Sequence, residues 1–600
     1  MNSEPSDHRT AAVACLLASL AFAGWVHGTW LDWGLPSQKR AERLFASAEE
    51  LGRRVPAMIE QRRRYYEMVE SVFDPKTSFD ASYRDLVTRW QTPLFAALPE
   101  DLVLDRMRNY LIGVNVSDEQ MTLTAIAGLN PKRLDFVPGP LGYYGGFYYY
   151  TAAACLVLGK AAGWVTLNPG AEYYFAHPEE TRRMYVLVRA VNAVSILATL
   201  LAVFFIARRF GGWGTAAFSV LFFATFPLLV PFSHLSKAHI YGGFWLACSL
   251  WFCGKILEPA PHPASRRDYA LAGAALGLCA GSIITNLTAG ILLFFTEWIR
   301  EDWNFGRALK SRGLWLAAAA FLGVFAAANF YIFLNFDQFR RLVRALNEFA
   351  PAITSVRWGE WPPYLLGFFT EQVHWSLAPF LAAGVVFAVK EKNRFGILCA
   401  LAAAALFIHN LVMMRHPPIN LRLLPFLAIL AGWGAAGLLE RFPGWKRAAL
   451  AACMISSVVV SALQSDFYRD LHRDPSNLDL AGDWINREIP KGSSIGAWGG
   501  GFSPFDFPSI RFLDYELISI PHPADLDSSQ PVPGKMPEYL VLTQGYSKGE
   551  GDPLEASRFI SSRYREVIRW EGAKSIPGFR FESNWIRTGN NLVRILKKES

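Results

Sequence analysis

Long apolar runs constrain this chain more than any other feature of its sequence. Residues 213–231 and 314–334 approach or exceed the ~18 to 20 residues that cross a hydrocarbon core. The chain has 600 residues, of which 52% are apolar and 18% charged, whereas about 25% of an average globular chain is charged. This pattern predicts a polytopic α-helical membrane protein and argues against an ordinary soluble enzyme.

Eleven membrane spans are predicted. Residues 269–298 are read as two short spans because Gly281, Ser282 and Asn286 interrupt them. Residues 11–30 resemble a signal peptide, but Arg9 is the one firm positive charge before them, so an uncleaved first span is favoured. The other predicted spans are 185–206, 213–231, 239–257, 314–334, 375–389, 395–413, 421–439 and 448–463.

The basic residues predict how the chain is oriented. The net charge is +8, and the positive charges form short clusters between apolar runs, which is typical of span orientation rather than nucleic-acid binding. If the aromatic run 142–167 lies in the interface instead of spanning, every cluster falls on the cytoplasmic side. We therefore predict a cytoplasmic N-terminus and an outer C-terminus in a bacterial cytoplasmic membrane.

Two polar regions lie outside the predicted spans. Residues 31–183 would form a large first outer loop with interfacial helices, inside a transmembrane domain of residues 1–464. Residues 465–600 alternate helix-like and strand-like stretches and predict a small extracytoplasmic α/β domain. The helices are expected at 477–488 and 554–565, and strands at 494–498, 539–543 and 592–596. All seven cysteines lie in apolar segments, so no disulfide framework is implied.

One acidic pair in the first outer loop is a candidate for chemistry. Residues 117–126, which begin Ser-Asp-Glu-Gln, predict a helix with Asp118 and Glu119 in its first turn. Carboxylates at that position also simply favour the helix dipole. Both interpretations stay open at this point.

This pair and its surroundings resemble the GT-C superfamily of membrane glycosyltransferases, in particular the branch of protein O-mannosyltransferases and the lipid A aminoarabinose transferase. The further motifs that carry the resemblance, in chain order, are Leu129-Asn130-Pro131, Asp135-Phe136-Val137-Pro138-Gly139-Pro140, an aromatic interfacial helix, Arg189, Arg208-Arg209-Phe210-Gly211 and Arg422-Leu423-Leu424-Pro425. The resemblance implies transfer of a sugar from a polyprenyl-phosphate carrier on the outer face, with Asp118 as catalytic base. Glu119 would orient Asp118 or a metal.

The sequence departs from the family in the outer loop 233–239. Several relatives have an acidic residue there, whereas this loop has His234 and His239. Without that carboxylate a divalent metal is doubtful, and hydrogen-bonded interfacial histidines explain the two imidazoles equally well. No cofactor is certain, the metal stays open, and these histidines, Tyr143 and Tyr144 are candidates to line the site.

Basic residues at the outer ends of spans are candidates to bind a carrier phosphate, because arginine and lysine both donate to phosphate oxygens. They are Lys237, Arg415, Arg422 and Arg189. Snorkelling to lipid headgroups is the alternative for the first three. Arg189 lies about one turn inside a span, so pairing with an outer-loop acid explains it equally well.

The leading interpretation is an integral-membrane glycosyltransferase that uses a polyprenyl-phosphate sugar, inverts the anomeric centre, and modifies a glycan, lipid or protein hydroxyl. The alternatives are a transporter or flippase for lipid-linked saccharides and a scaffold that binds a partner. The sequence shows no repeated halves of the kind that transporters often have. It does not indicate which sugar, acceptor or carrier length is used.

Overall fold

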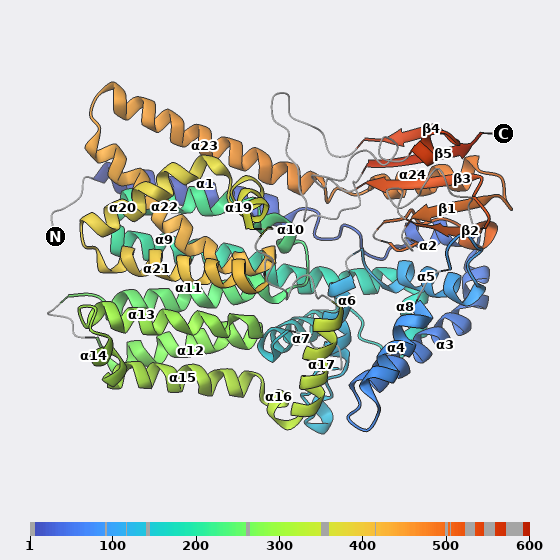
Figure 1. Cartoon of the computed structure of the whole chain (residues 1–600), viewed down its shortest axis with the longest axis horizontal. Coiled ribbons are helices and arrows are strands. Elements are labelled where there is room, and N and C mark those ends of the chain that lie inside the picture. Colours follow the sequence, from blue (N-terminus) through green and yellow to red (C-terminus); the bar gives the residue numbers. More distant parts are fainter. Residues whose placement is uncertain are drawn as a thin grey trace.

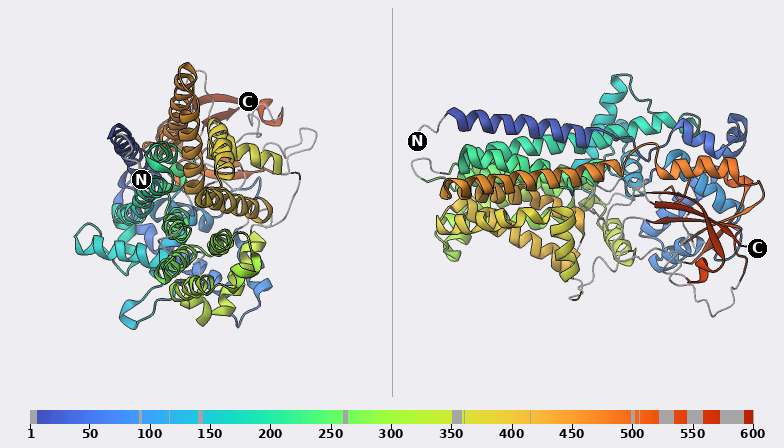
Figure 2. Two further views of the ribbon diagram at one scale, coloured as in Figure 1. Left: turned by 90° about the vertical axis from the view of Figure 1, so that its left-hand side faces the viewer. Right: turned by 90° about the horizontal axis from the view of Figure 1, so that it is seen from above.

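The computed structural model consists of a long bundle of apolar helices with a mixed helix and sheet region at one end (Figure 1). It describes residues 6–90, 93–115, 117–139, 144–259, 264–349, 359, 361–414, 416–498, 502–504, 506–521, 534–544, 558–571 and 592–599. Figure 2 looks along the bundle in one view and shows the two chain ends far apart in the other.

Each predicted span forms helix. The bundle helices are α1 (Ser6–Gly28), α9 (Pro178–Ala224), α10 (Leu229–Ser233), α11 (Ala238–Ile256), α12 (Arg266–Ser282), α13 (Ile291–Arg300), α15 (Arg312–Ala328), α19 (Trp361–Gly367), α20 (Ala378–Lys390), α21 (Arg394–His409), α22 (Leu424–Arg441) and α23 (Trp445–Asp470). The 47 residues of α9 are two helices that meet at Gly212, whose φ of 84° is left-handed backbone that glycine adopts without steric cost. The interruption predicted within residues 269–298 is the short helix η2 (Ile284–Gly290).

The apolar helices are those of an integral membrane protein. In the described part of the chain, five helices are long and apolar enough to cross a membrane, and a pair bent by 89° would make a sixth. The five are α1, α9, α21 with its π-helical extension, α22 with the preceding η7 (Pro417–Leu423), and α23; the bent pair joins α19 to α20. The count of eleven spans therefore stays a prediction.

Three basic clusters, Arg307/Lys310/Arg312, Lys390/Lys392/Arg394 and Arg441/Lys446/Arg447, belong to α14 (Phe305–Lys310) and to the turns between α20 and α21 and between α22 and α23. These elements lie at the end of the bundle where the N-terminus lies (Figure 1). Ion pairs join the turns at this end. Arg209 donates to Glu258 at 2.9 Å and Arg394 to Asp302 at 2.5 Å. This common location is the arrangement that the orientation argument requires.

The segment predicted to be the first outer loop folds into helices at the opposite end of the bundle. They are α2 (Gln38–Leu44), α3 (Ala48–Phe73), α4 (Phe79–Trp90), α5 (Glu100–Ile112), α6 (Ser117–Ala127), α7 (Gly146–Ala161) and α8 (Ala171–Ala176), and α16 (Phe330–Leu334) and α17 (Phe336–Phe349) lie beside them. The helix predicted from residue 117 is thus observed. In Figure 1 the aromatic helix α7 lies beside α6 and α17, at the outer end of the bundle.

The C-terminal region is built on a five-stranded sheet in the order β2-β1-β3-β5-β4. Its strands are β1 (Ser494–Trp498), β2 (Glu516–Ile520), β3 (Tyr539–Gln544), β4 (Tyr564–Trp570) and β5 (Leu592–Lys598), with helices α24 (Asn477–Glu488) and α26 (Arg558–Ser561). β1 pairs in parallel with β2 and β3, and β5 pairs antiparallel with β3 and β4. In register, Gly496 faces Leu540, and Leu540 faces Leu596.

The first outer loop and this domain share one hydrophobic core. Met107 and Tyr110 of α5 pack in the same buried cluster as Ile485 of α24 and Ile495 of β1. The Tyr110 hydroxyl donates to the carbonyl of Phe507 at 2.7 Å. The two outer regions, which are far apart in sequence, therefore form a single body.

Several details differ from the sequence prediction. Residue 565 lies in strand β4, so the helix predicted for 554–565 is wrong at its end: α26 stops at Ser561, and residues 554–557 lie outside the described part. In β4 the partly buried Ile568 and Trp570 alternate with exposed residues, a period of two that favours a strand. Helix α23 ends at Asp470, so the boundary placed after residue 464 falls inside a helix. The division into two domains remains a prediction.

Topology gives a first testable expectation. With a membrane-impermeant maleimide on intact cells, cysteines introduced at Ser78 and Lys598 should both react, because the two outer regions form one body. A cysteine at Lys446, in a basic cluster at the opposite end, should not react. Ser528, the position suggested by the sequence alone, lies outside the described residues. Labelling at position 446, or at only one outer site, would contradict the predicted orientation.

Candidate active site

Glu119 is buried in an ion pair rather than free for chemistry. It lies in the first turn of α6 and is 0% exposed. Arg189 of α9 donates to it through two nitrogens, from Nε to Oε1 at 2.9 Å and from Nη2 to Oε2 at 2.6 Å. The backbone N–H of Ser236 donates to Oε1 at 2.7 Å. This bidentate geometry holds α6 against α9 and against the loop before α11.

Arg189 also binds a third segment of the chain, the residues just after α1. Its Nη1 donates to the carbonyls of Leu31 at 2.7 Å and Trp33 at 2.9 Å, just after α1. With its donors directed at these partners, Arg189 is better explained by pairing with an outer-loop acid than by contact with a ligand. The sequence analysis left these two alternatives open.

Asp118 directly precedes this anchored residue. It lies in the first turn of α6, but its side chain is outside the described part of the structure. Its role as base stays a prediction.

The loop between α10 and α11 is fixed by neutral hydrogen bonds. Asn192 donates to the carbonyls of Leu235 at 2.6 Å and Lys237 at 2.8 Å, and Thr122 donates to that of Ser236 at 2.9 Å. The last of these bonds links the loop to α6. The loop therefore has a fixed backbone beside the acidic pair.

His234 is in contact with a histidine that the sequence analysis did not single out. Its Nδ1 lies 3.0 Å from Nδ1 of His472, which follows α23. Burial lowers the pKa of His472 to about 3, and burial together with His472 lowers the pKa of His234. Both imidazoles are therefore neutral near pH 7, and neither contributes positive charge to bind an anion. Among the described residues no group of three or more metal-ligating side chains occurs.

Two of the predicted basic residues, Lys237 and Arg422, lie near His239 together with His416, whereas Arg189 pairs with Glu119. The Lys237 Nζ lies 6.0 Å from the ring of Phe232, which lies 6.4 Å from that of His239. Arg422 lies in η7, which packs against α11, the helix that carries His239. The His239 ring lies 5.8 Å from that of Tyr144 and 6.3 Å from that of His416. Tyr143 and Arg415 lie outside the described residues.

Arg422 is a buried cation whose partners in the described part of the chain are all neutral. It is 2% exposed and donates to Thr288 Oγ1 at 2.9 Å, Thr285 O at 3.2 Å and His409 Nδ1 at 3.1 Å. Its Nε has no partner, and no described carboxylate lies within salt-bridge distance of the guanidinium. A buried charge without a counter-ion is costly, so an anionic ligand would relieve this arrangement.

A network of polar side chains lies near Arg422, and the sequence analysis missed it. Asn410 and Asn420 donate to the Tyr364 hydroxyl at 2.6 and 2.7 Å, and Asn420 also donates to Gln372 at 2.8 Å. The sequence could have indicated this network through the amide side chains inside or beside apolar runs, because buried polar groups need hydrogen-bond partners.

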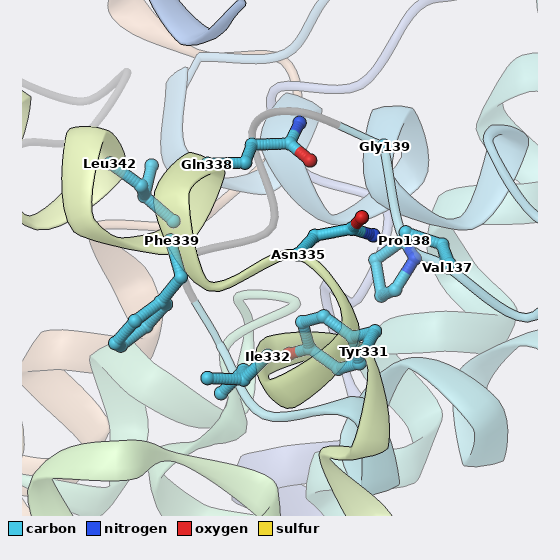
Figure 3. Close-up of a pocket in the computed structure, with 9 residues that line it drawn as sticks. All are labelled: Val137, Pro138, Gly139, Tyr331, Ile332, Asn335, Gln338, Phe339 and Leu342. Atoms are coloured by element: carbon cyan, nitrogen blue, oxygen red, sulfur yellow. The ribbon is translucent and has the colours of Figure 1, made fainter. Parts of the chain in front are cut away.

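A small cavity lies under the turn at residues 137–139, part of one of the family-like motifs. Figure 3 shows this turn facing Tyr331 of α16 and Asn335, with α17 on the other side. Its volume of about 30 Å³ is enough for one or two waters and too small for a sugar. The cavity is therefore not a substrate site in this conformation.

Two kinds of solved structure show what the chain is similar to. One is ArnT from Cupriavidus metallidurans bound to undecaprenyl phosphate, with 14% identity over 80% of this chain and 93% of that chain and a TM-score of 0.44. Another is the oligosaccharyltransferase AglB from Archaeoglobus fulgidus in complex with an inhibitory peptide and a dolichol-phosphate, with 12% identity over 67% and 60% and a TM-score of 0.44. Both are GT-C superfamily membrane glycosyltransferases, the superfamily that the sequence resembles. No protein-family model and no curated protein sequence matches the chain.

Proposed function

We propose that this chain is an integral-membrane glycosyltransferase that transfers a sugar from a polyprenyl-phosphate carrier to an acceptor hydroxyl on the outer face of the membrane. The observation that carries the proposal is Arg422, a buried guanidinium whose partners among the described residues are all neutral, near Lys237, His416 and His239. Such a group suits one lipid phosphate at the end of an apolar bundle.

The proposed mechanism divides the work between two parts of the site. Arg422 and Lys237 would donate to the carrier phosphate and stabilise the negative charge that grows on it as the glycosidic bond breaks. Asp118 would accept the proton of the acceptor hydroxyl as that oxygen attacks the anomeric carbon from the opposite side, which inverts the centre. The Glu119–Arg189 pair would keep α6, and thus Asp118, in place.

The transport alternative has no supporting observation in the described part of the chain. A buried acid anchored by Arg189, next to a second acid in the same helical turn, suits a reaction centre better than a passage for a lipid-linked saccharide. The acceptor, the sugar and the carrier length are not part of the proposal.

Carrier binding tests the phosphate site. Arg422→Ala should weaken binding of undecaprenyl phosphate to the purified chain by about 10- to 100-fold, the typical worth of charge-assisted hydrogen bonds. Arg422→Lys should lie between wild type and Arg422→Ala, since it keeps the charge and loses the planar fork.

Arg441→Ala is the matched control. It removes an arginine from the opposite end of α22, where Arg441 pairs with Glu391 on the basic side. Folding is checked by thermal unfolding, because Arg422 also donates to protein carbonyls. Equal carrier affinity in wild type and a folded Arg422→Ala variant would remove Arg422 from the site.

A further inference from the structure

A second, larger cleft lies at the junction of the outer loop and the C-terminal domain. Its volume is about 990 Å³, at the upper end of the range for ligand sites. The cleft lies between three helices: α2, the beginning of α9, and α24. Its lining residues include six basic and six acidic side chains. No aromatic residue is among those that line it, so it does not suit a lipid tail.

Much of this charge is neutralised inside the cleft wall. Arg43 donates to Asp479 at 2.5 Å and to Asp483 at 2.6 Å. Arg182 pairs with Asp32 and, at 3.4 Å, with Glu179. These fixed pairs, which join two arginines to four carboxylates, shape the wall.

Three basic groups in the same cleft have no carboxylate partner among the described residues. Arg40 is 6% exposed and donates only to the carbonyl of Gly34 and to Asn115 Oδ1, both at 3.2 Å. Arg511 has a buried Nε without any partner. Lys39 also lines the cleft and is exposed.

Two acids of the cleft also have no ion-pair partner in the described part of the chain: Glu42, which accepts from Gln38 at 3.3 Å, and Asp474. Burial, followed by the nearby charges of Asp479 and Asp32, raises the pKa of Asp474. No hydrogen bond or ion pair satisfies its side chain within the described part of the chain. Three cations and two carboxyl groups of the cleft thus have no ion-pair partner in the described part of the chain, a set that offers donors to an anionic group and acceptors to hydroxyls.

The cleft is also connected to the candidate active site by a single short segment. The Asp32 side chain lines the cleft, while the carbonyls of its neighbours Leu31 and Trp33 accept from Arg189, the partner of Glu119. On the cleft side, Arg40 donates both to the carbonyl of Gly34 and to the side chain of Asn115, a residue that lies shortly before α6. The cleft wall and the Glu119–Arg189 pair therefore share the chain segment of residues 31–34.

We infer that this cleft binds an anionic saccharide and serves as the acceptor site. Arg40, Arg511 and Lys39 would bind its carboxylate or phosphate oxygens, and Asp474 would accept from its hydroxyls. The acceptor role rests on the proposed function, whereas binding of the saccharide does not.

Protection of a reporter cysteine tests binding directly. The full-length chain carrying Gln38→Cys, a lining position, is placed in lipid nanodiscs and treated with a maleimide, and labelling of position 38 is followed by peptide mapping. Trigalacturonate and phosphorylated maltotriose are the anionic probes, and maltotriose is the neutral one. We expect an anionic probe to slow labelling at position 38 at a concentration at least tenfold lower than maltotriose, and to leave a Ser78→Cys reporter unaffected.

Matched arginine variants make the test specific to the cleft. Arg511→Ala should raise the concentration for half-protection about tenfold or more. Arg54→Ala removes an arginine that pairs with Glu100 away from the cleft and should have no effect. No protection by either anionic probe, equal protection of position 78, or an unchanged half-protection in Arg511→Ala would overturn the site. Protection without any sugar transfer by the wild type would overturn the proposed function and leave the site standing.

Discussion

Replacing Asp118 by asparagine is expected to lower sugar transfer by about 10² to 10⁴-fold, the usual contribution of a general base. The amide keeps the size of the side chain but cannot accept the proton of the acceptor hydroxyl. Carrier binding should change little, because the phosphate would be held by Arg422 and Lys237 rather than by α6. Transfer from a polyprenyl-phosphate sugar in a membrane preparation measures the effect.

The control for Asp118 must be another acid at the start of a helix. Glu119→Gln, which suggests itself from the sequence as a neighbour in the same turn, is unsuitable because Glu119 is a buried ion-pair partner. Asp101 in the first turn of α5 is exposed and serves instead. If Asp118 only favours the helix dipole, both Asp→Asn changes would cost about 0.3 to 1 kcal/mol of stability and leave turnover intact. Full activity of Asp118→Asn at a normal protein level would remove the catalytic assignment.

Replacing Glu119 by alanine should destabilise the folded chain by about 3 to 5 kcal/mol, because it leaves the buried Arg189 charge without a counter-ion. The loss comes from desolvation that is no longer compensated. Removing both charges, in Glu119→Met with Arg189→Met, should be less damaging than the sum of the single changes.

Unfolding of the purified chain measures this coupling. We expect both single variants to unfold well below the wild type and the double variant to recover part of the loss. Single variants as stable as the wild type would contradict the buried pair. Additive losses in the double variant would show that the two side chains act independently.

Part of the local structure of the C-terminal domain could be predicted from the sequence. The helix at 477–488 and the strand at 494–498 have the predicted bounds, because their apolar residues recur with the period of a helix or a strand. The strands β2 and β4 were missed. β4 is an edge strand with a register irregularity near Glu566, so only part of it shows the alternation of a strand.

The long-range contacts could not be predicted. The Tyr110 hydroxyl bonds to a carbonyl 397 residues away, and His234 meets a histidine 238 residues away. The periodicity of apolar residues predicts helices and strands but not such pairs, because these depend on how the folded elements pack against one another. The Glu119–Arg189 pair could be predicted in part. A buried arginine in an apolar segment needs a partner, but the sequence did not show which residue that partner is.

The grouping of the basic residues was predicted in part. Lys237 and Arg422 were singled out because basic residues usually lie on the cytoplasmic side, whereas these two are predicted on the outer side. The structure places both near His239. The charged cleft had no such signal. Its residues come from separate polar segments where charged side chains are common, and only the fold shows that Arg40 and Arg511 share one wall.

The central claim is that this chain consumes a polyprenyl-phosphate sugar. The most direct measurement is the lipid-linked sugar content of cells that lack the chain, compared with the same cells carrying wild type or Asp118→Asn. The account predicts that one polyprenyl-phosphate sugar accumulates without the chain, that wild type removes it, and that Asp118→Asn at a normal protein level does not. An unchanged set of lipid-linked sugars in cells lacking the chain would contradict it.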